Sequence, residues 1–272
     1  MKYLIACDLD GSLLNSRGEI TKKTIKVLTM LKDQGHKVVL ATGRPFSGAY
    51  PKYEELNLDT PLITDNGGSI QNPTDSSFAK QKTYIPLDMM HQLFTFSKPY
   101  LASAFFSVDD TVYAYRYDER LQGFFSGTRA RNIIQKDFDQ LTVEPTGIVF
   151  LVFVDHQALF EGYIEAHLRQ TLSYRQWGTD RKYAIYEVYL RHISKSSAIK
   201  YLLDHYGMTY NQVIAFGDGV NDVEMIRDAH LGIAMKNGMD DVKRVAKDIT
   251  EFTNDEDGIA KYLVKFFDLK LK

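Results

Sequence analysis

Residues 3–11 are YLIACDLDG, an apolar run that ends in two carboxylates and a glycine. Its length and composition predict a short strand buried on both faces, as in a parallel sheet. Asp8 and Asp10 stand where this strand is expected to stop. Because alternate residues of an extended chain project to the same side, both carboxylates can face one site. Asp and Gly are also common turn formers, so this stretch alone indicates a turn more readily than an acidic site.

The sequence around this strand alternates helical and strand-like segments. Residues 21–35 have an apolar helical face and end at a glycine, and residues 36–42 predict a second buried strand. A weakly helical segment at 46–56 and a short strand at 61–68 follow. This alternation predicts an α/β fold with a doubly wound parallel sheet and helices on both faces.

The pattern changes between residues 84 and 186. Helical periodicity and strand-like runs there predict helices at 86–96 and 156–172, two strands around a turn at Asp109 and Asp110, and further strands at 147–155 and 182–190. The parallel pattern then resumes with a helix at 194–207, a strand at 211–219, and helices at 221–230, 240–249 and 257–269. We therefore predict a discontinuous core, residues 1–83 plus 187–272, with an inserted α+β cap domain at 84–186.

Composition limits the partners of the 272-residue chain. Its 33 Lys and Arg against 35 Asp and Glu give a formal net charge of −2. A chain of this charge has no net positive field that would attract nucleic acid or an anionic membrane surface. No apolar stretch approaches the roughly 20 residues that span a bilayer. The single cysteine, Cys7, forms no internal disulfide, and no signal-like segment opens the chain, so a cytoplasmic location is expected. A small molecule is the expected partner, and the sequence does not indicate an oligomeric state.

Polar groups also end two other expected strands. HKVVLAT ends in Thr42, and Gly43 follows; a hydroxyl and backbone amides that open a helix suit phosphate oxygens, although the same pair is an ordinary helix start. NQVIAFGDG brings Asp218 to a strand end, with Asn221 and Asp222 in the next turn. These hard oxygen ligands suit magnesium, although an N-cap with acidic first-turn residues has the same composition.

Lys195 opens the helix after EVYLRHIS and on its own indicates a solvated surface lysine. In an open parallel sheet, however, ligands bind beyond the carboxyl ends of the strands. The DLDG stretch, Thr42, Lys195 and the group around Asp218 are all expected there. Their coincidence favours one site that binds phosphate and metal.

In chain order, DLDGSLL, ATGRP, the region of Lys195 and GDGVND resemble the four motifs of the haloacid dehalogenase-like (HAD) phosphatase superfamily. The insert between the second and third motifs, with TDNGGSI, is similar to the Cof-type branch of sugar-phosphate phosphatases over essentially the whole chain. The resemblance implies a core with Rossmann-like topology and an α/β cap. Ser12 stands where the family commonly has Thr, and SKSSA replaces its usual Lys-Gly pairing.

The resemblance implies a role for each motif residue. Asp8 is the nucleophile that forms an aspartyl-phosphate, and Asp10 is the general acid and base. Mg2+ is bound by Asp8, Asp218 and the backbone carbonyl of Asp10, with Asp222 orienting the metal-bound water. The groups implied to hold phosphoryl oxygens are Lys195, Thr42, Asn221 and the amides of Leu9 and Gly43, and those implied to approach the leaving group are Arg44, Asn66 and Gly67.

The expected activity is magnesium-dependent hydrolysis of a small phosphorylated metabolite, with sugar phosphates as the first candidates. Three alternatives stay open. The first is a phosphatase for a cofactor such as pyridoxal phosphate or flavin mononucleotide. The second is a phosphomutase that passes the phosphoryl group to another alcohol. The third is a protein that binds a phosphorylated metabolite without turnover. The cap is expected to choose the substrate, and the alternation of its aromatic residues indicates core packing.

Overall fold

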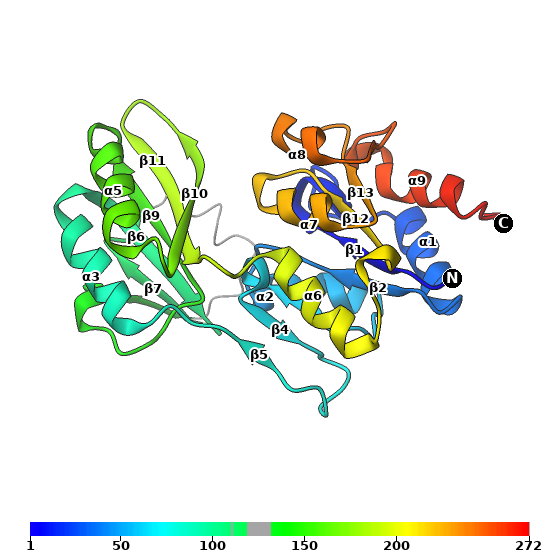
Figure 1. Cartoon of the computed structure of the whole chain (residues 1–272), viewed down its shortest axis with the longest axis horizontal. Helices are drawn as coiled ribbons and strands as arrows, with labels where there is room; N and C mark the ends of the chain where they lie inside the picture. Colours follow the sequence, from blue (N-terminus) through cyan, green and yellow to red (C-terminus); the bar gives the residue numbers. More distant parts are fainter. Residues whose placement is uncertain (110, 119–131, 272) are drawn as a thin grey trace. The chain divides into compact units, whose positions relative to one another are not determined.

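The computed structural model describes residues 1–109, 111–118 and 132–271, in two compact units (Figure 1). The first unit comprises Met1–Gly43, Ala49–Gln81 and Ser194–Lys272, and the second comprises Arg44–Gly48 and Lys82–Ile193. A boundary between residues 186 and 187, as drawn from the sequence, would cut the strand β11 (Tyr183–Leu190), which belongs to the sheet of the second unit.

The first unit is built on a sheet with the strand order β14-β13-β12-β1-β2. The strands are β1 (Leu4–Cys7), β2 (Lys37–Leu40), β12 (Val213–Gly217), β13 (Leu231–Ala234) and β14 (Asp248–Ile249). All their pairings are parallel, and β1 lies between β12 and β2, with Cys7 opposite Phe216 on one side and Leu40 on the other. The predicted α/β fold with a parallel sheet is confirmed, and the strand ends named from the sequence are adjacent.

Helices cover both faces of this sheet. They are α1 (Lys22–Asp33), α2 (Phe46–Glu55), α6 (Lys195–Tyr206), α7 (Val223–Asp228), α8 (Asp240–Val245) and α9 (Gly258–Phe266). Leu4 and Ala6 of β1 share a buried core with α6 and α7. Phe216 of β12 points the other way and meets Tyr262 of α9 edge-on, with 5.6 Å between ring centroids. In the part of the chain that the structure describes, no helix is long and apolar enough to cross a membrane.

A small three-stranded sheet extends from the end of β2. It consists of β3 (Leu62–Thr64), β4 (Ser69–Gln71) and β5 (Gln81–Lys82). A parallel bridge between Ala41 and Ile63 aligns β3 with the end of β2. The turn at residues 65–67 between β3 and β4 is thereby brought beside the carboxyl ends of the main sheet.

The second unit is a six-stranded sheet with helices packed on it. Its strand order is β10-β11-β9-β6-β7-β8, formed by β6 (Leu101–Val108), β7 (Thr111–Tyr115), β8 (Asn132–Gln135), β9 (Gly147–Phe153), β10 (Leu172–Thr179) and β11. The pairings are antiparallel except for β7 with β8. Side chains of α3 (Leu87–Ser97) and α5 (Gln157–Tyr163) fill a core with Phe150 and Tyr186. The predicted α+β character of this unit is confirmed.

Two details differ from the sequence prediction, and a third lies partly outside the described residues. The helix expected at 156–172 ends earlier, because Leu172 begins β10, a strand that the sequence analysis missed. The helix expected at 240–249 ends at Val245, because the backbone of Ala246 is extended and β14 then pairs with β13. In the turn between β6 and β7, Asp109 has a left-handed backbone, whereas Asp110 lies outside the described residues.

Candidate active site

Asp8 follows β1 at the centre of the parallel sheet and is buried, with 4% of its surface exposed. Its N–H donates to Phe216 O over 3.0 Å, so the strand pairing continues to the carboxylate-bearing residue. The chain then makes one wide turn, in which the N–H groups of Leu13 and Leu14 donate to the carbonyls of Asp8 and Leu9. These two hydrogen bonds hold the backbone that follows Asp8 in a short turn.

Gly11 and Ser12 of this turn fit closely around Asp218, which follows β12. Gly11 has φ +78°, and a Cβ there would lie 2.2 Å from Asp218 Oδ2, so only glycine fits. Ser12 Oγ donates to Asp218 Oδ1 over 2.8 Å. The hydroxyl at position 12, which the resemblance left without a role, therefore orients a carboxylate of the site.

Lys195 links Asp8 to Asp222. Its side chain is fully buried, and its ammonium donates to Asp8 Oδ1 and to Asp222 Oδ1, each over 2.6 Å. The other oxygen of Asp222 accepts from the N–H groups of Asp218 and Gly219, both over 3.0 Å. Asp222 thus orients both the lysine and the loop that carries Asp218. The surface position that the sequence favours for an isolated Lys195 is wrong.

Burial and the crowding of carboxylates shift the pKa values in this cluster. Burial raises the pKa of Asp8 well above its usual value, although the Lys195 ammonium acts in the opposite direction. Burial also raises the pKa of Asp218 to about 6, against the hydrogen bond from Ser12. Burial alone would lower the pKa of Lys195, but Asp222 and Asp8 outweigh it and raise that pKa above the ordinary range. The lysine therefore stays cationic, and the carboxyl groups of Asp8 and Asp218 bind protons more tightly than exposed ones do.

The same carboxylates fit a divalent cation. Asp8, Asp218 and Asp222 each have an oxygen within 4.8 Å of the others. Hard oxygen donors of this kind suit Mg2+, and a cation there would neutralise the charge that Lys195 leaves uncompensated. Because the Lys195 ammonium takes one oxygen each of Asp8 and Asp222, the second oxygen of Asp8 and the carboxylate of Asp218 are the donors that this arrangement leaves for a metal.

Thr42, Asn66 and Asn221 lie together at the neighbouring strand ends. Thr42 is buried at the end of β2, and its carbonyl accepts from Asn66 N–H over 3.0 Å. Asn221 Nδ2 donates to Asn66 Oδ1 over 2.9 Å. A Cβ on Gly43 would lie 3.0 Å from the same Asn66 oxygen. The structure therefore brings together the hydroxyl, amide and backbone groups for which the family resemblance implies contacts with phosphate oxygens and, for Asn66, with the leaving group.

The remaining predicted residues have different surroundings. Leu9 is fully buried, whereas Asp10 is exposed and is not one of the three carboxylates that lie within 4.8 Å of one another. Gly67, with φ +102°, lies against the carbonyl of Ser194, the residue before Lys195. Arg44 belongs to the second unit, where it donates to Gly48 O over 3.3 Å.

Sequence reasoning missed Asn237, which supports the turn after Asp8. Its Nδ2 donates to Gly11 O over 2.7 Å, and its Oδ1 accepts from Asn254 N–H. Nearby, Met239 N–H donates to Asp218 O. The Asn-Gly pair at 237 and 238 signals a turn, but its partner lies more than 200 positions away, and no local pattern reveals that contact.

Comparisons with known proteins show that the chain as a whole is similar to phosphatases. A family model described as haloacid dehalogenase-like hydrolase matches residues 5–263. The chain is 32% identical over 268 residues to the 5-amino-6-(5-phospho-D-ribitylamino)uracil phosphatase YitU of Bacillus subtilis, with 98% of each chain covered. A haloacid dehalogenase-like hydrolase from Bacteroides thetaiotaomicron has a TM-score of 0.82 at 28% identity, covering 98% of this chain and 100% of that one. The HAD subclass IIB sugar phosphatase BT4131 has a TM-score of 0.81 at 25% identity, covering 98% and 99%.

Proposed function

Because this chain belongs to the haloacid dehalogenase-like hydrolases and is a phosphatase of that family, we propose that it hydrolyses sugar or sugar-alcohol phosphates with magnesium. The resemblance found in the four motifs is confirmed at the level of the family and of the phosphatase class. The observation that carries the finer proposal is the buried Asp8, whose carboxylate is held by Lys195 beside Asp218.

The proposed substrate class combines two kinds of support. One relative is named for a phosphate ester of a ribityl chain, and one structural neighbour is named a sugar phosphatase. Both substrates carry the phosphate on a polyhydroxylated carbon chain. We therefore propose a phosphate monoester of a sugar or sugar alcohol, and 5-amino-6-(5-phospho-D-ribitylamino)uracil is the first compound to assay.

Asp8 is the proposed nucleophile. Lys195 donates to one of its oxygens, which fixes the orientation of the carboxylate for in-line attack on phosphorus. The new Asp8 oxygen–phosphorus bond forms as the bond from phosphorus to the leaving oxygen breaks, and Asp10 donates the proton that turns this oxygen into an alcohol. Asp10 then accepts a proton from the water that cleaves the aspartyl-phosphate, so inorganic phosphate leaves and Asp8 is regenerated.

The other groups hold charge in place during these steps. Mg2+, when held by Asp8, Asp218 and the carbonyl of Asp10, supplies positive charge next to the transferring phosphoryl group. Lys195 and Asn221 are proposed to bind phosphoryl oxygens, together with the Thr42 hydroxyl and the amides of Leu9 and Gly43. Asp222 contributes indirectly, because it fixes Lys195 and the backbone of Asp218.

Phosphate release from a substrate panel tests the proposal. The panel contains 5-amino-6-(5-phospho-D-ribitylamino)uracil, hexose phosphates, pyridoxal phosphate, flavin mononucleotide and para-nitrophenyl phosphate, each with magnesium and with chelator. We expect Asp8→Asn to lower turnover by at least about 10³, because no other group replaces a covalent nucleophile. The matched control is Asp204→Asn, which alters an exposed carboxylate paired with Lys200 on α6 and is expected to retain the wild-type rate.

Each part of the proposal has an outcome that contradicts it. Near-normal turnover by Asp8→Asn rejects the covalent step, and activity that resists chelator rejects the metal. Faster hydrolysis of pyridoxal phosphate or flavin mononucleotide than of any sugar or ribityl phosphate rejects the substrate class. Transfer of labelled phosphate to an added sugar at the expense of water identifies a phosphomutase, and substrate binding without release identifies a protein that no longer turns over.

A further inference from the structure

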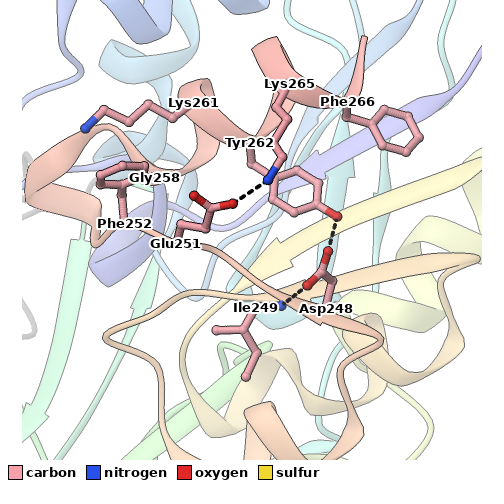
Figure 2. Close-up of a pocket in the computed structure, with 9 residues that line it drawn as sticks. All are labelled: Asp248, Ile249, Glu251, Phe252, Gly258, Lys261, Tyr262, Lys265 and Phe266. Atoms are coloured by element: carbon pink, nitrogen blue, oxygen red, sulfur yellow. Dashed lines mark hydrogen bonds and ion pairs between the residues drawn. The ribbon is translucent and has the colours of Figure 1, made fainter. Parts of the chain in front are cut away.

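A pocket of about 410 Å³ lies in the first unit between β14 and α9. Its volume falls in the range of small-molecule sites. None of its lining residues belongs to the candidate active site, and the lining side chains in Figure 2 are either aromatic or charged, apart from Ile249 and Gly258. The pocket therefore calls for an explanation other than the phosphatase reaction.

The two carboxylates of this pocket already have partners. Asp248 Oδ2 accepts from Tyr262 Oη over 2.8 Å, and Asp248 Oδ1 accepts from Ile249 N–H over 2.8 Å. Glu251 forms an ion pair with Lys265, and that bond raises the pKa of Lys265. Figure 2 shows all three interactions as dashed lines. Glu251 is thus neutralised by Lys265, whereas Asp248 is bonded by neutral donors and keeps its negative charge next to Tyr262.

Of the two lysines that line the pocket, Lys261 is the one that takes no part in these pairs. Its ammonium lies over the ring of Phe252, 3.6 Å from the centroid, and within the described residues it has no carboxylate at ion-pair distance. A cation over an aromatic face is stabilised less than a cation that is paired with an anion. Lys261 is only half-buried, so an incoming anion can reach its ammonium group. The lining as a whole carries two acidic and two basic side chains, so a negative group is favoured only at the Lys261 end, while Asp248 bears a negative charge beside Tyr262.

The rest of the lining favours a flat apolar body. Tyr262 and Phe266 are stacked, with 6.4 Å between centroids and an angle of 15° between rings. Figure 2 shows these rings at one end of the pocket and Phe252 with Lys261 at the other. Aromatic walls of this kind accept planar rings by offset stacking or edge contact. A ligand with a ring system and one terminal anion matches both ends.

The wall that carries Phe252 is held in place before any ligand arrives. Thr250 Oγ1 donates to Phe252 O over 2.7 Å and accepts from Lys236 N–H over 2.8 Å. A Cβ on Gly258 would lie 2.4 Å from the same Phe252 carbonyl, so the start of α9 is packed directly on this wall. A fixed wall lowers the ordering cost of binding.

From these contacts we propose that the pocket between β14 and α9 binds a small planar aromatic anion. Lys261 pairs with the anionic group, and Phe252, Tyr262 and Phe266 contact the ring. The shared chemistry is that of an aromatic carboxylate or an aromatic ring with a terminal phosphate. Binding at this pocket is independent of turnover at Asp8.

Calorimetric titration with 2-naphthoate, and with its neutral analogue 2-naphthamide, tests the site at neutral pH. We expect the wild type to bind naphthoate about tenfold more tightly than naphthamide, the effect of one charge-assisted contact at a half-buried site. Lys261→Met keeps most of the side-chain length, removes the charge, and is expected to abolish this preference. Lys22→Met, at an exposed lysine of α1 that does not line the pocket, is expected to keep it.

Two further measurements locate the bound naphthoate. Asp8→Asn is expected to bind it as the wild type does, because Asp8 does not line the pocket. Naphthyl phosphate in place of naphthoate, added to Asp8→Asn so that it is not consumed, shows whether carboxylate or phosphate is preferred. The proposal is overturned by equal binding of naphthoate and naphthamide to the wild type, or by an absence of binding. The comparison of the two ligands on the wild type decides the matter even if Lys261→Met does not fold.

Discussion

At the scale of single residues, Lys195 is the cation that balances the buried carboxylates of the active site. It lies fully buried between two carboxylates, with 2.6 Å to each. Taking these charges out of water is costly, and the mutual attraction and hydrogen bonds of the pair offset that cost only while every partner is present. The site is therefore sensitive to the loss of this one ammonium.

We predict that Lys195→Met destabilises the protein by about 3 kcal/mol or more, the cost of leaving buried carboxylates without their cation. Chemical denaturation in the presence of chelator measures this. The matched control is Lys200→Met on the same helix, which removes an exposed pair with Asp204 and is expected to cost less than about 1 kcal/mol. Phosphatase activity should fall only in the first variant. Equal stability losses in both variants would mean that the buried pairs contribute no more than a surface pair.

At the scale of secondary-structure elements, the start of α6 decides where Lys195 lies. Ser194 is the N-cap, and its hydroxyl accepts from Ser197 N–H over 3.2 Å while Ser197 Oγ accepts from Ser194 N–H over 2.9 Å. The carbonyl of Ser194 accepts the helical bond from Ala198. Gly67 packs against this same carbonyl, so the turn after β3 and the start of α6 fit together only without a side chain at position 67.

Two glycine variants separate the effect of a steric contact from the effect of backbone strain. Gly67→Ala would place a Cβ 2.2 Å from Ser194 O, whereas Gly207→Ala, at the other end of α6, meets nothing within 4 Å although φ is +63°. We expect Gly207→Ala to cost about 1 kcal/mol of stability, the penalty of a left-handed residue, with turnover unchanged. Gly67→Ala should cost more and lower kcat at least about tenfold, because a displaced helix start moves Lys195.

Unfolding curves and kcat for both glycine variants check this prediction. A Gly67→Ala variant that loses stability but keeps its full kcat would show that the turn only supports the fold. A Gly207→Ala variant with reduced kcat would show that α6 as a whole, and not its first turn, positions the lysine.

At the scale of the whole molecule, the sequence predicted the strand ends better than the contacts between them. Short apolar runs before Asp8, Thr42 and Asp218 have few interpretations, and parallel sheet order places their ends at one edge. The hydrogen bond of Asn237 to Gly11 and the pairing of Lys195 with Asp222 depend on three-dimensional packing, so no local pattern contains them.

The segments that the sequence misassigned share a physical cause. Residues 172–179 form β10 at a sheet edge, where exposed residues leave little apolar alternation to detect. The two-residue strand β14 also lies at an edge and follows a helical run without a glycine or proline to end it. In both places pairing with a neighbouring strand outweighs local propensity.

A cation should connect the charge of the active site to the stability of the molecule. In the unfolded chain without metal, the Asp218 carboxyl loses its proton as the pH rises through 3.8, its ordinary pKa. In the folded chain its pKa is about 6, so it keeps the proton up to a higher pH. The folded state then binds more protons from pH 3.8 up to about 6, so this carboxyl makes metal-free stability fall as pH rises through that window. Mg2+ must displace that proton, and its stabilising effect should therefore be larger above this window than within it.

We predict that saturating Mg2+ raises the thermal unfolding midpoint of the wild type, and that it raises it more at a pH above about 6 than between pH 3.8 and about 6. At a free concentration of about 100 times Kd the expected gain is about 2.7 kcal/mol. Asp218→Asn should lose most of the shift, whereas Asp204→Asn should keep it, and sodium at equal ionic strength should not reproduce it. If Mg2+ leaves the midpoint unchanged at every pH, the three carboxylates and Lys195 form a self-sufficient ion-pair network, and the metal-dependent part of the proposed mechanism is wrong.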